Sequence, residues 1–403
     1  MLGAGNLLRM MHTLYVAHQS RGIITLTFDP CKPPSSSIQI ENTVQAGYLP
    51  QWLTLHGDYV YSMSRTQFPD ESSTSAGIFA FEKAELSKET GPPIHDGNLI
   101  FVSNTSSNGL GGVYCGIGNN GQTISAANIN GGTVSIHPLS EKGQIGEATY
   151  VFNYNHDSEV QHNPHQAAFD PSGKWMLVPD RSADLLRVYR VAGPNNVTQV
   201  HVVKLPHGTG CRHVTFRAFS PTRTFAYLVS ENDNTVRVFA LDGVENAPEC
   251  SSNPPSDKIE VKLLQTASTL GPGSNRTPPA RVHLAAEVAI SNDGRHFYAS
   301  NRDTKSAASD TIAIYSVHPE SESQHLEYLG QSETHGKIPR HFSLSPDPGN
   351  RYLAVANQVS NTIMIMRRDT DTGLIGDLVG EISLGDFDKT TKKGPVAVVW
   401  SSE

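Results

Sequence analysis

Four stretches of the chain repeat the same pattern of apolar and polar positions. They start at Phe169, Phe219, Ile290 and Leu344, and the first reads FDPSGKWMLVPDRSADLLRVYRV. Each stretch holds a turn with Asp-Pro, Ser-Pro or Asn-Asp-Gly, an apolar strand, a short polar cluster and a second, alternating strand. A unit of two or three strands cannot bury its apolar face alone, so the units must stack on one another. Repeats of about fifty residues with this β pattern predict the blades of a β-propeller rather than a helical solenoid.

Three less regular stretches, residues 12–28, 49–81 and 123–136, fit the same unit and bring the number of units to seven. The first unit lacks the inner strand that precedes the pattern in later units, and residues 394–400 (GPVAVVW) look like that missing strand. A C-terminal strand that completes the first blade would close the ring and remove its free edges. We therefore predict an all-β fold, a seven-bladed β-propeller closed in this way. It forms a single domain over residues 1–403, with blades in 11–400 and an N-terminal extension in 1–10.

Composition excludes several classes of partner. The formal charge of −8 and the lack of a Lys/Arg cluster argue against nucleic-acid binding. No apolar run approaches the roughly eighteen residues of a membrane-spanning helix, and Arg9 interrupts a stretch that would make a poor secretory signal. Cys31, Cys115, Cys211 and Cys250 have no paired spacing, so neither a disulfide nor a metal site is indicated. We expect a cytoplasmic protein with reduced thiols and no cofactor. Both a monomer and a homo-oligomer are compatible with the sequence.

Polar residues recur at equivalent positions of the repeated units. Counting back from the turn of each unit aligns four residues at the start of the inner strand: His165, Arg212, Ala286 and Arg340. The next position along the chain carries Gln166, His213, Glu287 and His341. The second strand of each unit ends in a polar pair: Asp180-Arg181, Glu231-Asn232, Asn301-Arg302 and Asn357-Gln358. Equivalent positions of stacked blades lie on rings about the axis, so these side chains should gather near the central channel.

Each ring residue also has a purely structural explanation. Polar side chains on inner strands line water-filled channels, and Asp or Asn at strand ends satisfy turn amides. A turn does not need Arg212, Arg302 and Arg340 in one basin, however, and several arginines with few acids are costly unless they bind an anion. A histidine beside them is suited to carry a proton near neutral pH. His162 and His165 could bind a metal together, but no third ligand stands at a close spacing.

Five segments together resemble a known family: residues 128–134 (NINGGTV), 164–171 (PHQAAFDP), 211–213 (CRH), 300–302 (SNR) and 339–342 (PRHF). In their order and spacing they are similar to the seven-bladed propeller lactonases. That family includes the fungal 3-carboxy-cis,cis-muconate lactonizing enzyme and the bacterial propeller-type 6-phosphogluconolactonase. The resemblance runs from residue 99 to residue 400. The family's glycine-proline before the Arg-His pair is Gly210-Cys211 here, and the loops 70–75 and 250–279 look particular to this chain.

The resemblance implies a catalytic set of His165, Arg212, Glu231 and Arg302, which both branches of the family retain. It implies an enzyme without a cofactor that forms or opens a lactone on a small anionic substrate, with 3-carboxy-cis,cis-muconate cyclisation as the main hypothesis. A 6-phosphogluconolactonase-like hydrolase is the alternative. A propeller cyclase of secondary metabolism and a non-catalytic binding propeller are further alternatives, although the chain has no Trp-Asp signature of scaffold propellers. The remaining ring residues are expected to bind substrate: Gln166, His213, Glu287, Arg340, His341 and Gln358.

Overall fold

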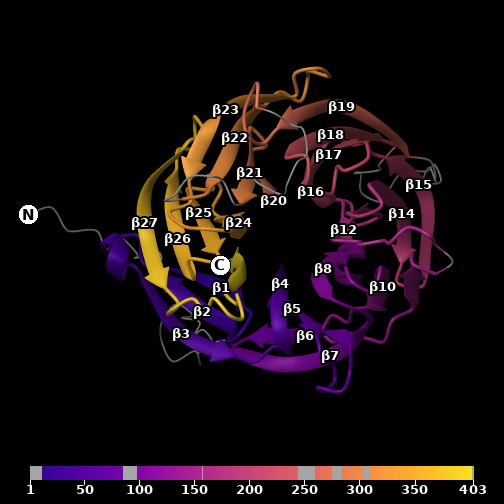
Figure 1. Ribbon diagram of the computed structural model, residues 1–403, viewed down its shortest axis with the longest axis horizontal. Coiled ribbons are helices and arrows are strands. Elements are labelled where there is room, and N and C mark those ends of the chain that lie inside the picture. The colour runs from indigo at the N-terminus through magenta and orange to yellow at the C-terminus, as the bar shows by residue number, and fades with distance from the viewer. Residues whose placement is uncertain are drawn as a thin grey trace, which may run out of the picture.

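The computed structural model describes residues 11–84, 98–156, 158–243, 259–274, 284–302 and 309–401. Within these ranges the strands form seven four-stranded antiparallel sheets, which stand around one central axis like the blades of a propeller (Figure 1). The predicted all-β, seven-bladed fold is confirmed. The two helices of the described ranges are single 3-10 turns, η1 (Pro34–Ser36) and η2 (Asn119–Gly121). No helix in that part of the chain is long and apolar enough to cross a membrane.

The first three blades come from the less regular units. From its inner to its outer strand, blade 1 consists of β28 (Pro395–Trp400), β1 (His12–His18), β2 (Gly22–Phe28) and β3 (Ile38–Val44). In the same order, blade 2 consists of β4 (Tyr48–His56), β5 (Tyr59–Thr66), β6 (Ser75–Lys83) and β7 (Leu99–Leu110). Blade 3 consists of β8 (Gly112–Gly118), β9 (Thr123–Asn128), β10 (Thr133–Pro138) and β11 (Tyr150–Asn153).

The last four blades come from the regular repeats. Blade 4 consists of β12 (Ala168–Phe169), β13 (Trp175–Asp180), β14 (Leu185–Gly193) and β15 (Asn196–Lys204). Blade 5 consists of β16 (Cys211–Ser220), β17 (Arg223–Ser230), β18 (Thr235–Asp242) and β19 (Glu260–Ser268). Blade 6 consists of β20 (Leu284–Ile290), β21 (His296–Arg302), β22 (Thr311–Val317) and β23 (Leu326–Glu333). Blade 7 consists of β24 (Pro339–Leu344), β25 (Tyr352–Asn357), β26 (Thr362–Arg368) and β27 (Ile375–Ser383).

The C-terminal strand closes the ring, as the sequence predicts. Strand β28 is the inner strand of blade 1 and pairs antiparallel with β1, with Leu14 opposite Trp400. Trp400 is buried, and its indole N–H donates to the carbonyl of Ser343 in blade 7 at 3.1 Å. The closing strand therefore joins the last blade to the first and covers the edge of β1, which would otherwise be the unpaired inner strand of a three-stranded blade.

The turns of the repeat set where each second strand begins. In blade 4, Oδ1 of Asp170 accepts the Trp175 amide at 2.9 Å and the Ser172 hydroxyl at 2.8 Å. Gly173 lies in this turn at φ 68°, a conformation that residues with a Cβ rarely adopt. The second strands that follow are mostly buried because they are flanked on both faces by neighbouring blades, and β13 is buried along its whole length.

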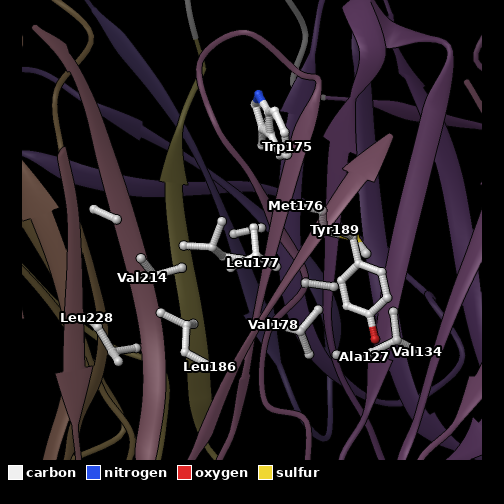
Figure 2. Packing of buried hydrophobic residues seen from close by; sticks show 14 of the residues in the cluster. Ala127, Val134, Trp175, Met176, Leu177, Val178, Leu186, Tyr189, Val214 and Leu228 are labelled. Atoms are coloured by element: carbon white, nitrogen blue, oxygen red, sulfur yellow. The ribbon is translucent and has the colours of Figure 1, made fainter. Parts of the chain in front are cut away.

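The hydrophobic core lies between the blades rather than inside any one of them. Figure 2 shows one such cluster, in which Leu177 and Leu186 of blade 4 lie near Val214 and Leu228 of blade 5. All four side chains are buried. Burying a side chain of this size stabilises the fold by about 1.5–3 kcal/mol. The stacking that the repeats require is therefore the main source of the ring's stability, and it holds the inner strands in place around the axis.

Candidate functional site

A β-bulge recurs near the start of the inner strands and gives the site its shape. In blade 5, Cys211 pairs with Ser230 and His213 with Val229, so Arg212 is an extra residue in the inner strand. Shifts of the same kind interrupt the inner strands of blades 2, 3, 6 and 7. A bulge bends a strand and redirects its side chains. As a result, Arg212 and the following His213 take part in one network of polar contacts.

The strand register defines three rings of equivalent positions. The bulge ring contains Gln51, Val113, His165, Arg212, Ala286 and Arg340. The waist ring is the next position along each inner strand and contains Trp52, Tyr114, Gln166, His213, Glu287 and His341. The strand-end ring follows the second strands and contains Gln19, Arg65, Arg181, Glu231, Arg302 and Gln358. We call the end of the channel at the strand-end ring the arginine mouth, and the end at the turns after the inner strands the turn mouth.

The register differs in one detail from the sequence alignment. Ser230 pairs with Cys211 as Asp180 pairs with Pro164, so Glu231 is equivalent to Arg181 and not to Asp180. The inner strand of blade 5 is the longest of the inner strands of the four regular repeats, and its extra residues shifted the alignment by one. The consequence is that Glu231 shares a ring with arginines on both sides.

Glu231 is the centre of an ion-pair network at the arginine mouth. Its Oε1 accepts a hydrogen bond from Nε of Arg181 at 2.5 Å. Its Oε2 accepts one from Nη2 of Arg302 at 3.0 Å and lies 3.3 Å from Nε of Arg212. Three guanidinium groups thus surround one carboxylate. The structure brings together three of the four residues of the expected catalytic set in direct contact.

The charges in this network are strongly perturbed. Burial alone would raise the pKa of Glu231, but the charges of Arg302, Arg181 and Arg212 outweigh it and hold that pKa at about 2. Burial, together with the neighbouring Arg302, lowers the pKa of Arg212 well below 12.5. Nε of Arg212 is buried, and its contact with Oε2 of Glu231 at 3.3 Å is an ion pair without hydrogen-bond geometry, so Nε makes no hydrogen bond in the described ranges. A buried donor without an acceptor is costly, so this basin has capacity for a further anion.

His165 lies beside the network and belongs to a chain of hydrogen bonds. Its Nδ1 is 3.0 Å from Nε2 of His213, and Nδ1 of His213 is 3.0 Å from Oε2 of Glu287. Among the described residues, none hydrogen-bonds to Nε2 of His165. Burial and the charge of Arg212 lower the pKa of His165 well below 6.5. The imidazole is therefore neutral at neutral pH, which is the form that a general base requires.

The waist ring forms the floor between the two mouths. The indole of Trp52 meets the rings of His213 and His341 edge-on at centroid distances of 5.1 and 4.9 Å. Gln166 accepts the amide of Val214 through Oε1 at 2.6 Å. Below the floor, a cavity of about 480 Å³ extends from Glu287 and His341 to residues of the turn mouth. The floor is thus made of side chains, and it separates the arginine mouth from this cavity.

Two of the expected substrate-binding residues lie away from the Glu231 network. Arg340 is half-buried and donates from Nη2 to Oε1 of Gln51 at 3.4 Å. Burial and the charge of Arg302 lower its pKa to about 10. Gln358 donates to the side chain of Gln19 at 3.1 Å. Both occupy ring positions, and neither makes a hydrogen bond to Glu231 in the described part of the chain.

Sequence reasoning missed three residues of the site. Arg181 stands in an aligned pair of the repeats but was not among the expected site residues, although it makes the shortest contact to Glu231. Arg65 is the strand-end residue of blade 2, and its charge helps to lower the pKa of Arg340. Trp52 supports two histidines of the floor. Treating every polar residue at an equivalent strand end as a site candidate would have found Arg181. The irregular sequence pattern of blade 2 concealed that Arg65 and Trp52 occupy the same ring positions as site residues of the later blades.

The histidine pair considered as a metal site has other partners. Nδ1 of His162 is 2.5 Å from Oδ2 of Asp180, and its Nε2 is 3.1 Å from the hydroxyl of Ser158. Across the described ranges, no group of three or more His, Cys, Asp or Glu side chains is arranged to hold a metal ion. The described cysteines, Cys31, Cys115 and Cys211, are free thiols. Cys250 and two parts of the 250–279 loop, residues 250–258 and 275–279, lie outside the described residues.

Comparisons with known proteins agree with this architecture. A family model described as "Lactonase, 7-bladed beta-propeller" matches residues 9–387. The 6-phosphogluconolactonase of Formosa agariphila is 24% identical over 353 residues, which cover 85% of this chain and 87% of that protein. A probable 6-phosphogluconolactonase of Arthroderma benhamiae is 26% identical over 371 residues, or 90% of this chain and 83% of its own. The structure of the periplasmic gluconolactonase of Pseudomonas aeruginosa superposes with a TM-score of 0.75 at 21% identity, covering 98% of this chain and 99% of the other.

Proposed function

The chain belongs to the seven-bladed β-propeller lactonase family, and from this premise we propose that it hydrolyses the lactone of a small anionic sugar acid at the arginine mouth. The finer part of the proposal is that the substrate is a phosphorylated sugar lactone. Relatives that carry the name 6-phosphogluconolactonase support this choice over most of the chain's length. The site residues themselves are proposed from their geometry.

The observation that carries the proposal is the excess of guanidinium groups over carboxylates beside a neutral histidine. Glu231 contacts Arg181, Arg212 and Arg302, and Nε of Arg212 is left without a hydrogen-bond acceptor in the described ranges. A phosphate or carboxylate oxygen would supply that acceptor. Charge-assisted hydrogen bonds of this kind contribute about 1.5–3 kcal/mol each. Binding an anion would thus balance the positive charge that a single carboxylate, Glu231, shares among three guanidinium groups.

The reaction that follows is a base-assisted attack of water on the lactone carbonyl. His165 would accept a proton from the attacking water through Nε2, which has no hydrogen-bond partner in the described part of the chain. Arg212 and Arg302 would hold the anionic group and stabilise the oxyanion that forms on the carbonyl oxygen. Glu231 would keep the guanidinium groups in position through its ion pairs. The collapse of the tetrahedral intermediate breaks the ring C–O bond and gives the hydroxy acid.

The cyclisation of 3-carboxy-cis,cis-muconate, the main hypothesis from the sequence, remains a second candidate. It uses the same four residues, with the arginines binding carboxylates and His165 delivering a proton to carbon. The named relatives favour hydrolysis, because several of them carry the name 6-phosphogluconolactonase. The cytoplasm stays the expected location, and the oligomeric state stays a prediction to be measured.

One assay panel separates these functions. Proton release in a pH-stat from 6-phosphogluconolactone and from unphosphorylated gluconolactone is compared with the loss of ultraviolet absorbance of 3-carboxy-cis,cis-muconate. The proposal predicts acceleration with the phosphorylated lactone and a higher kcat/KM than with the unphosphorylated one. Fast loss of muconate absorbance with no lactone hydrolysis would establish the cyclase instead. No acceleration of any of the three reactions would refute both.

A further inference from the structure

A continuous chain of titratable groups runs from His165 of the bulge ring into the waist ring, between the two mouths. His165 at the arginine mouth is 3.0 Å from His213, and His213 is 3.0 Å from Glu287. Glu287 and His341 in turn line the cavity of about 480 Å³ that reaches the turn mouth. All four side chains are at most 5% exposed. The chain therefore starts beside the proposed reaction centre and ends at the floor of a separate cavity.

The hydrogen bonds fix which nitrogen carries each proton. The amide of Val398 donates to Nδ1 of His341 at 3.3 Å, so the ring proton of His341 must lie on Nε2, which faces Oε2 of Glu287 at 3.8 Å. The amide of Val288 donates to Oε1 of Glu287 at 3.1 Å. Glu287 is thus surrounded by donors and acts as an acceptor.

The same reasoning continues to the reaction centre. Nη1 of Arg212 lies 3.3 Å from Nδ1 and 3.4 Å from Nε2 of His213. The contact of Nδ1 with Glu287 is shorter, at 3.0 Å, and Glu287 accepts, so Nδ1 of His213 carries the proton and Nε2 is the acceptor for Nδ1–H of His165. Nε2 of His165 is then an unprotonated nitrogen without a partner in the described ranges, which is the arrangement of a general base. His213 contacts His165, and Glu287 contacts His213, so the two residues together orient the imidazole of His165.

We propose that His165, His213 and Glu287 form a proton relay that carries the proton produced by each turnover from the arginine mouth to the turn mouth. This inference rests on the proposed lactone hydrolysis. The sequence predicts substrate binding for His213 and Glu287, whereas the relay gives them a different role, as positioning and proton-transfer residues behind the base.

The proton balance of the reaction supplies the proton that the relay would carry. Water gives one proton to Nε2 of His165 as its oxygen bonds to the carbonyl carbon, and this proton returns to the ring oxygen as the C–O bond breaks. The new carboxylic acid then loses its proton, so one proton per turnover is left over. This proton binds Nε2 of His165, while Nδ1–H passes to His213 and Nδ1–H of His213 passes to Glu287. The relay resets when Glu287 releases the proton to solvent in the cavity and water takes the proton from Nε2 of each imidazole and returns one to its Nδ1.

Charge explains why the proton would move on rather than stay. An imidazolium at His165 would lie among Arg181, Arg212 and Arg340, and together with burial these charges lower its pKa well below 6.5. Burial raises the pKa of Glu287, although His341 and Arg212 oppose this. Transfer along the relay moves the positive charge of the His165 imidazolium away from the arginines and neutralises the carboxylate of Glu287. His165, His213 and Glu287 are then all neutral. A substrate bound at the arginine mouth would not block this outlet, because the floor separates it from the cavity.

The first test replaces Glu287 with glutamine, which keeps the shape and a hydrogen bond but cannot take up a proton. With 6-phosphogluconolactone in a pH-stat, we expect kcat to fall about ten-fold or more while KM changes less than about two-fold. Glu333→Gln, an exposed residue at the end of β23, is the matched control and should leave both constants unchanged. An unchanged kcat, or a raised KM with kcat intact, would overturn the relay and return Glu287 to substrate binding.

A second variant tests the direction of the outlet. Glu287→Ala removes the carboxylate at the wall of the turn-mouth cavity, which is large enough to admit formate. Formate should restore kcat in a saturable way, and chloride at equal ionic strength should not. Loss of kcat in the alanine variant without any restoration by formate would count against the relay.

A third measurement does not depend on catalysis. Nitrogen NMR of the histidine side chains in the free protein should show His165 and His213 protonated on Nδ1, and Glu287→Gln should shift the Nδ1 proton of His213. Protonation of His165 on Nε2 would overturn the relay. If the wild-type protein hydrolyses no lactone, the proposed function fails, and the NMR result alone then decides whether the hydrogen-bond relay exists.

Discussion

Replacing Glu231 with glutamine tests the charge network in both its strength and its pH dependence. The glutamine resembles the protonated carboxylic acid in shape and charge. The pKa of Glu231 is held at about 2, against 4.5 for a free side chain. This shift of about 2.5 units corresponds to about 3 kcal/mol of stability at pH 7. We therefore expect the variant to be destabilised by about that amount at pH 7.

The sign of the pH dependence follows from the direction of the shift. A carboxyl whose pKa is depressed in the folded state stabilises above its unfolded pKa, and this stability is lost as pH falls towards the folded pKa. For values of 4.5 and about 2, the contribution falls from about 3 kcal/mol at pH 7 to about 1 kcal/mol at pH 3. The difference between wild type and Glu231→Gln should narrow by about 2 kcal/mol over this range.

Urea unfolding at pH 7 and pH 3 measures this difference directly, with Glu333→Gln as a control that should match wild type at both pH values. Equal stability of wild type and Glu231→Gln at pH 7 would refute the reasoning. So would a difference that stays constant between pH 7 and pH 3, because the loss would then come from packing and not from the carboxylate's charge.

Three further outcomes are expected. Arg302→Ala should raise KM for 6-phosphogluconolactone about ten-fold or more, since it removes a charge-assisted contact with the substrate. The control Arg295→Ala, on an exposed turn, should leave KM unchanged. Equal KM values for the two variants would show that Arg302 does not bind the substrate. In the pH profile of kcat/KM, activity should fall on the acid side only below pH 6.5, because burial and nearby arginines lower the pKa of His165. An acid-side loss with an apparent pKa at or above 6.5 would show that another residue is the base. Trp400→Ala should cost about 3–5 kcal/mol in urea unfolding, with a smaller loss for Trp400→Phe, and a stable alanine variant would contradict the role of the closing strand.

The fold was accessible from the sequence because its unit repeats. Turns such as Asp170-Pro171 mark the same point of each later blade, so counting from them locates inner strands without knowledge of long-range contacts. The closing strand was accessible for a related reason, since residues 394–400 have the inner-strand pattern but no second strand after them. Where the repeat is irregular, as in blade 2, the equivalence of Arg65 and Trp52 could not be seen.

The site was accessible only in part, because the contacts depend on bulges. A bulge such as the one at Arg212 shifts the register by one residue, and nothing in the local sequence announces it. Counting could place His165, Arg212 and Glu231 near the axis, but it misaligned Glu231 and could not show which ring members touch. The continuity from His165 through His213 to Glu287 is a property of side-chain geometry across three blades, and no pattern within one blade encodes it.

The central claim is that the arginine mouth hydrolyses an anionic lactone with His165 as the base. The most direct measurement compares kcat for 6-phosphogluconolactone between wild type and His165→Asn in a pH-stat, with spontaneous hydrolysis subtracted. The account predicts a loss of about 10²–10⁴-fold in kcat with little change in KM. A His165→Asn protein that is folded and retains the wild-type kcat would contradict it.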